Sequence, residues 1–268
     1  ATYAPVTIYD VNLGRKSASY VRTIQHNLGH ANSIDYSEGN GCLILGDGSS
    51  DASLPGAIYI LPNAASRDVW KYADCVKIDL TGKGWGIKTN VVWGESNNGA
   101  FNIAYVITNN NADIRKILLT RKNGQFDGGY IVLGHWHGEA VDVNQGSVFR
   151  NGKLYTAVGH SQLWVLEHTL NDDGSITVRQ YKDLMYDDNG NLLNAPYTEG
   201  VTYAHGCLFV GSSAGEILVY GDEPMPYYKS SSGGTDDETE ELTEVIPAGN
   251  YFAKQKMTHP AATMAQDI

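Results

Sequence analysis

Residues 134–139 (GHWHGE) hold side chains that could bind a metal ion. His135 and His137 are two positions apart, so both imidazoles lie on one face if this segment is an extended strand. Imidazole nitrogens and carboxylate oxygens are common zinc ligands, and Glu139 or His30 could complete the set. One His-x-His pair is a weak zinc signature, however, and we predict that the chain holds neither a metal nor another cofactor.

The same segment offers a second chemistry through Trp136. An indole ring provides a flat apolar surface for a sugar ring, and neighbouring His and Glu side chains can hydrogen-bond the sugar hydroxyls. We therefore predict that His135, Trp136, His137 and Glu139 contact a saccharide. The alternative, which the sequence leaves open, is that this segment is a loop packed between neighbouring strands.

The elements that must position these groups belong to a repeat of about 54 residues. Residues 145–159 (QGSVFRNGKLYTAVG) align with residues 199–212 (EGVTYAHGCLFVGS), and the order of polar residue, β-rich run, glycine turn and Leu-aromatic pair is the same. The turn glycines, separated by 58, 53 and 54 residues, are Gly41, Gly99, Gly152 and Gly206. Four turns at nearly constant spacing predict an array of similar units.

Each unit is predicted to contain four short antiparallel strands. We expect third strands at residues 57–61, 114–119, 162–166 and 216–220, and fourth strands at residues 75–80, 129–134 and 176–184. Runs of β-branched and aromatic residues between Gly, Asn and Asp turns are typical of such meanders. Repetition around an axis solves the problem of exposed sheet edges, so we predict an all-β propeller of four-stranded blades. A solenoid is the rival arrangement.

The number of blades depends on a further predicted strand pair at residues 6–12 and 19–25. If strand 19–25 completes the unit that begins at Glu199, the ring has four blades. If the pair belongs to a separate blade, the ring has five and needs a hairpin from elsewhere. We favour five blades over four.

Composition separates this repeat array from the rest of the chain. Residues 1–222 are predicted to form the propeller, and residues 223–241, rich in Ser, Gly and acidic side chains, to form a flexible acidic linker. Residues 242–268 show no repeat, and we interpret them as a docking peptide or a truncated module.

Charge and cysteine content limit the partners and the compartment. The formal net charge of −11 argues against nucleic acid and membrane partners, which need clustered Lys and Arg. The three cysteines cannot all pair, and Cys42 and Cys207 fall in apolar runs typical of buried thiols. Folding in a reducing cytoplasm fits this pattern, and no secretion signal is expected.

Polar residues at the blade openings form a second candidate site. The first strand of a propeller blade runs nearest the axis, so residues at its start tend to line the mouth of the channel. His30, Gln145 and Glu199 stand in register there, and Asn32 and Trp93 lie at the same openings. Polar groups that converge at one end of a rigid ring favour ligand binding. They could instead hydrogen-bond neighbouring backbone.

The openings at residues 29–36 (GHANSIDY), 145–149 (QGSVF) and 199–203 (EGVTY) resemble those of phage tail receptor-binding propellers, including the teichoic-acid-associated propellers of phages that infect Gram-positive bacteria. The resemblance covers residues 1–222. It implies a virion tail protein that is folded in the host cytoplasm, binds a cell-surface glycan, contacts other tail proteins and forms a homotrimer. It also implies glycan contacts by His30, Asn32, Gln145 and Glu199.

A second resemblance, to gluconolactonase-like propellers, implies a divalent metal held by Glu199 and Asn32. A metal-dependent hydrolase or lactonase is therefore one alternative function, and a structural or protein-docking propeller is another. The sequence contains no glycine-flanked serine of the kind that acts as a nucleophile on a strand-to-helix turn. We therefore expect an adhesin module rather than an enzyme.

Overall fold

The computed structural model of the 268-residue chain has an all-β fold with two single-turn 3-10 helices, η1 (Ala64–Ser66) and η2 (Tyr72–Asp74), in its described part. The structure describes residues 4–12, 17–28, 33–46, 56–85, 89–94, 102–141, 143–158, 164–183, 198–204, 207–212, 216–221, 225–227, 244–246 and 255–256.

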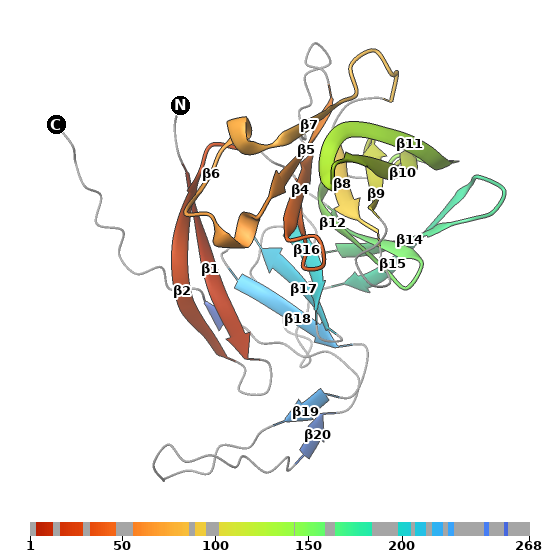
Figure 1. Ribbon diagram of the computed structural model, residues 1–268. Coiled ribbons are helices and arrows are strands. Elements are labelled where there is room, and N and C mark those ends of the chain that lie inside the picture. The colour runs from red at the N-terminus through yellow and green to blue at the C-terminus, as the bar shows by residue number, and fades with distance from the viewer. Residues whose placement is uncertain are drawn as a thin grey trace, which may run out of the picture.

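Four antiparallel sheets of four strands follow one another along the chain (Figure 1). The first sheet contains β3 (Ser33–Ser37), β4 (Cys42–Gly46), β5 (Ala57–Pro62) and β7 (Val76–Asp79). The second contains β8 (Asn90–Trp93), β9 (Ile103–Thr108), β10 (Asp113–Lys122) and β11 (Gln125–His137). The third contains β12 (Asn144–Arg150), β13 (Lys153–Val158), β14 (Trp164–Leu170) and β15 (Ile176–Asp183). The fourth contains β16 (Thr198–Ala204), β17 (Cys207–Ser212), β18 (Glu216–Gly221) and β21 (Gln255–Lys256). The prediction of repeated four-stranded antiparallel units is confirmed.

The hairpin turns carry the backbone conformations that Asn and Gly favour. Asn151 and Gly152 have φ values of 49° and 75°, and Asn123 and Gly124 have values of 53° and 79°. Two successive positive φ angles define the type I′ turn, whose twist matches that of the flanking strands. The predicted turn at Gly41 is also present, with a φ of 63°, whereas Gly99 and Gly206 lie outside the described residues.

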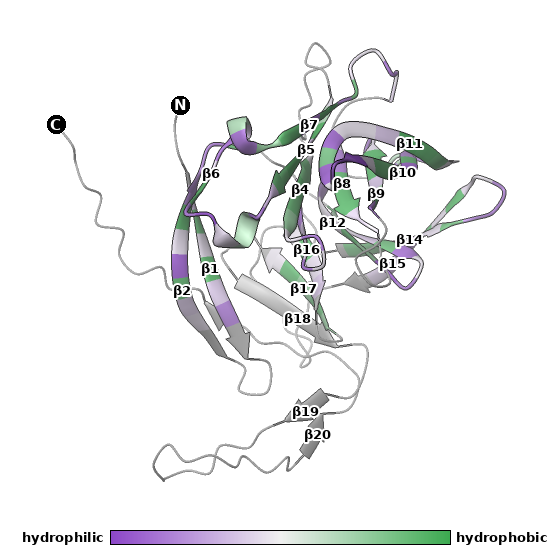
Figure 2. Ribbon diagram, in the orientation of Figure 1, coloured by the Kyte–Doolittle hydropathy of each residue, from purple (hydrophilic) through white to green (hydrophobic). Residues whose placement is uncertain are grey.

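Separate hydrophobic clusters lie between successive sheets. One joins the first and second sheets through residues such as Ile60 and Val106. Ile107 and Leu154 belong to the cluster between the second and third sheets, and the next cluster joins the third and fourth. The first strands also contact one another in sequence, β3 with β8, β8 with β12 and β12 with β16. Figure 2 shows the hydrophobic residues concentrated along strands such as β4, β5 and β8.

The N-terminal strand pair forms a sheet of its own. β1 (Ala4–Asn12) pairs with β2 (Ser17–His26), and β2 pairs in parallel with β6 (Val69–Trp70). A fourth hydrophobic cluster, which includes Ile24 and Leu61, joins this sheet to the first four-stranded sheet. In the described part of the chain the fourth strand of the Glu199 unit is β21, so strand 19–25 does not complete that unit.

The C-terminal region contributes three short strands. β19 (Met225–Tyr227) and β20 (Glu244–Ile246) form a two-stranded sheet, drawn below the other sheets in Figure 1. β21 lies within the segment predicted to be a docking peptide or a truncated module, and it pairs with β18. Cys42 and Cys207 are buried free thiols, as predicted. Among the described residues no helix has the length and apolar character that a membrane crossing requires.

Candidate functional site

The β10–β11 hairpin places a polar group of side chains on one face of the second sheet. Asp113 lies opposite His137, and Arg115 lies opposite His135. Directly paired residues share a face of the sheet, and residues two positions apart share it too. Four polar side chains from two strands therefore lie together.

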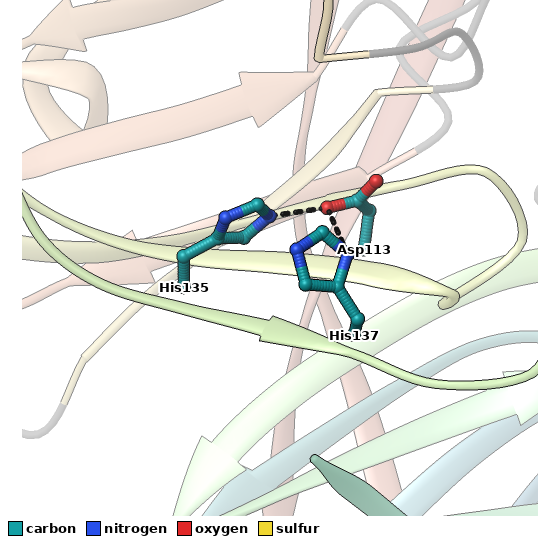
Figure 3. Close-up of side chains that lie close together, drawn as sticks. All are labelled: Asp113, His135 and His137. Atoms are coloured by element: carbon teal, nitrogen blue, oxygen red, sulfur yellow. Dashed lines mark hydrogen bonds and ion pairs between the residues drawn. The ribbon is translucent and has the colours of Figure 1, made fainter. Parts of the chain in front are cut away.

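Asp113 contacts both imidazoles (Figure 3). Its Oδ1 atom is 2.5 Å from Nε2 of His135 and 3.4 Å from Nδ1 of His137. The two imidazole rings are 3.9 Å apart between centroids and tilted by 60°. The side chain of His137 is 64% exposed and that of Asp113 is 17% exposed. The carboxylate is thus partly sheltered, whereas the imidazoles remain accessible to solvent.

Arg115 links this polar group to two aromatic rings. Its Nη1 atom is 3.2 Å from Oδ1 of Asp113, and its guanidinium carbon lies 4.8 Å from the ring centroid of Trp85. Trp85 in turn makes an edge contact with Tyr130 at a centroid distance of 5.3 Å. Burial lowers the pKa of Arg115 and Asp113 opposes that effect, although an arginine stays protonated in either case. The site therefore combines a fixed cation, a carboxylate, two imidazoles and partly exposed aromatic rings.

The residue that completes the group with His135 and His137 is neither of the two that the sequence suggested. Asp113, at the start of β10, joins the cluster in place of Glu139, which is exposed beyond the end of β11. His30, the other residue proposed, lies outside the described residues. Sequence reasoning also missed Arg115 and Trp85. The available signal was the predicted pairing of strands 114–119 and 129–134, which brings residues near 113 close to the histidines.

Trp136 points to the opposite face of the hairpin. Its indole packs against the cluster between the second and third sheets, with a ring centroid 6.5 Å from that of Tyr105. Its Nε1–H donates a hydrogen bond of 2.8 Å to the carbonyl oxygen of Asn171. These contacts favour the packing alternative for this side chain.

Trp93 is also packed in the interior, and its predicted place at a blade opening is wrong. It is the last residue of the first strand β8 instead of preceding that strand, and it is 7% exposed. Its ring lies 5.9 Å from that of Phe126 in the cluster between the first and second sheets. A side chain so enclosed offers little surface to a ligand.

Gln145 and Glu199 lie in register, as predicted, because each occupies a β-bulge near the start of a first strand. The pairing of β12 shifts between Asn144 and Gly146, and that of β16 shifts between Thr198 and Gly200. Glu199 is exposed, Gln145 is half-buried, and the other predicted opening residues, His30 and Asn32, lie outside the described residues.

Gly146, the glycine after Gln145, has a structural role. A Cβ atom on Gly146 would lie 2.9 Å from Cα of Gly200, closer than side-chain carbons approach backbone. The missing side chain of Gly146 therefore permits the first strands β12 and β16 to approach closely.

Comparisons with known proteins found only distant structural similarity. No family model matches the chain, and no curated protein matches it. Glutaminyl cyclase of Myxococcus xanthus is 13% identical, with 72% of this chain and 68% of that chain covered and a TM-score of 0.40. The complex of KlAtg21 with the coiled coil of AgAtg16 gives 14% identity, 76% and 57% coverage and a TM-score of 0.39. The Cps50 (Swd1) β-propeller domain of Myceliophteria thermophila gives 10% identity, 84% and 72% coverage and a TM-score of 0.37. Such values carry no information about activity.

Proposed function

We propose that this chain is a non-catalytic binding module, of the phage tail adhesin class, that recognises a bacterial surface saccharide through the polar face of β10 and β11. The observation that supports the proposal best is the group formed by the partly sheltered Asp113 and the exposed His135 and His137, beside Arg115 and partly exposed aromatic rings. In this setting the chain resides in the virion, contacts other tail proteins and forms a homotrimer.

The chemistry of this face suits a neutral or amine-bearing sugar. Sugar hydroxyls donate and accept hydrogen bonds, and the face supplies acceptors on Asp113 and both kinds of group on the imidazoles. The strands hold these groups in place before a ligand arrives, so little conformational entropy is lost on binding. The net charge of −11 disfavours a polyanionic ligand over most of the surface.

We also propose that the sheets form a ring of five blades, with β1, β2 and β6 as the fifth. Each sheet from β1–β2 to β16–β18 packs on the next through its own hydrophobic cluster, as the blades of a propeller do. In this arrangement the single strand β6 takes the place of the extra hairpin expected from the sequence.

A binding experiment tests the saccharide proposal. The purified chain, kept in a metal chelator, is applied to an array of bacterial surface glycans and to isolated Gram-positive cell walls. We expect saturable binding that His137→Ala weakens about tenfold, since one lost hydrogen bond to a bound sugar costs about 1.4 kcal/mol.

The matched control is Gln180→Ala, because Gln180 is an exposed residue on β15, the equivalent outer strand of the next sheet. This variant should bind like the unmodified chain. Absence of binding to every saccharide, or full affinity in His137→Ala, contradicts the proposal.

A further inference from the structure

We propose that Asp113, His135 and His137 form a binding site for a first-row divalent transition metal, with Zn²⁺ as the representative ion. One ligand atom from each of these side chains lies within 4.8 Å of the other two. The site goes beyond saccharide binding and does not depend on it.

The distances from Oδ1 of Asp113 to the two imidazoles suit a shared metal ion after a small adjustment. Zinc binds nitrogen and oxygen ligands at about 2.0–2.1 Å, which puts tetrahedral ligand atoms about 3.3 Å apart. The separation of 3.4 Å between Oδ1 of Asp113 and Nδ1 of His137 already fits. The 2.5 Å contact between the same oxygen and Nε2 of His135 is a hydrogen bond, which must widen by about 0.8 Å when the metal replaces the shared proton. Because His135 lies near the end of an outer strand and is 34% exposed, it has room to move.

The donor set selects the class of metal. Two imidazoles and one carboxylate suit zinc, nickel and copper better than calcium or magnesium, which prefer sites made of oxygen ligands. Three protein ligands leave at least one coordination position open to water or to a ligand atom.

Arg115 makes the site weaker than its ligands alone would make it. Its guanidinium carries a positive charge 3.2 Å from the ligating oxygen, and its contact with Trp85 restricts its movement. A metal cation is therefore repelled by this charge. Replacement of Arg115 by an uncharged side chain of similar length should therefore strengthen metal binding. A purely structural Arg115–Asp113 ion pair would not predict this gain in affinity.

The test is calorimetric titration of the untagged, chelator-treated chain with Zn²⁺ alone. We expect one ion per chain. Asp113→Asn, His135→Ala and His137→Ala should each weaken binding by about tenfold or more, because each removes a direct ligand. Arg115→Met should bind about threefold more tightly or better. A rise in melting temperature on addition of Zn²⁺, smaller in each ligand variant, is the second readout.

Two control variants show whether the ion binds at these three side chains or elsewhere on the chain. Glu139→Gln tests the carboxylate that the sequence suggested, and His26→Ala removes a histidine of the N-terminal sheet; both should keep full affinity. Circular dichroism of each variant shows that it is folded.

Failure to bind one Zn²⁺ per chain overturns the proposal. So does wild-type affinity in Asp113→Asn, because the exposed imidazole pair would then be binding metal by itself. Saccharide binding measured in chelator is unaffected by either result, so the two proposals fail separately.

Discussion

Asp113 and Glu167 lie on the third strands of neighbouring sheets but differ in how their charges are met. Each lies on the third strand of its sheet and directly opposite a residue of the fourth strand, His137 for Asp113 and Arg179 for Glu167. Arg179 donates to both oxygens of Glu167, at 2.6 and 2.9 Å, and Lys153 adds a contact of 2.8 Å.

The residue opposite each carboxylate on the fourth strand determines whether that carboxylate has a structural role or can bind a ligand. Glu167 is 2% exposed, and the hydrogen bonds from Arg179 contribute most to lowering its pKa to about 2. A fourth hydrogen bond, of 3.2 Å from the hydroxyl of Tyr155, leaves the two oxygens of Glu167 no free acceptor position for a ligand. Asp113 also has a cationic partner, Arg115, but the fourth-strand residue opposite it is the exposed His137, whose nitrogens can hold a proton, a ligand or a metal.

The largest predicted effect is a loss of stability at low pH caused by the burial of His168, the neighbour of Glu167. Burial lowers the pKa of this imidazole from 6.5 to about 4, and both of its nitrogens are buried without a hydrogen-bond partner. The folded state therefore takes up its proton later than the unfolded chain as the pH falls. Stability is lost from pH 6.5 downward and the loss is complete below pH 4, about 3 kcal/mol in total.

Urea denaturation of the wild type and of His168→Leu between pH 7 and pH 4 measures this loss. The variant should lack it. Burial also raises the pKa of Asp35 to about 6, so this residue adds stability as the pH falls from about 6 to 3.8. Both proteins contain Asp35, so its contribution cancels when the stability of the variant is subtracted from that of the wild type. Parallel pH profiles of the two proteins would show that His168 is not enclosed.

The second predicted effect is on the ion cluster itself. Glu167→Gln should lower the free energy of unfolding at pH 7 by about 2–3 kcal/mol, because Lys153 and Arg179 lose their carboxylate. The exposed side chains of both partners can be hydrated, which keeps the loss below that of a fully buried pair. The effect should vanish as the pH falls from 4.5 to 2, since Glu167 then becomes protonated in both states.

Chemical denaturation at several pH values measures this difference. Glu38→Gln, a change at an exposed turn residue, is the control and should alter stability by less than about 0.5 kcal/mol. A change below about 1 kcal/mol in Glu167→Gln at pH 7 would remove the distinction drawn between the two carboxylates.

The smallest predicted effect is at the open site. Asp113→Asn should lower stability in metal-free buffer by about 1–2 kcal/mol, because the buried guanidinium of Arg115 loses its carboxylate while the exposed histidine partners can hydrogen-bond water. The same urea experiment measures it. A loss as large as that of Glu167→Gln would mean that Asp113 is also a structural residue.

Much of the fold could be predicted because it depends on local patterns. The alternation of apolar residues marks the strands, and Asn-Gly or Gly turns such as those at Gly41 and Gly152 mark the hairpins. The partners of the N-terminal strands could not be predicted in the same way. β6 is only two residues long and lies far from β2 in the sequence, so no periodicity connects them.

The sequence by itself determined that His135 and His137 share a face, because residues two apart on a strand always do. Only the tertiary structure decided which residue they meet. Regular pairing from the turn, where Lys122 lies opposite Gln125, would place Gly134 opposite Asp113. Two register shifts in β10–β11, together three residues, bring His137 there instead. An odd shift reverses the faces of one strand relative to the other, so the bulges bring the histidines to the same face as Asp113.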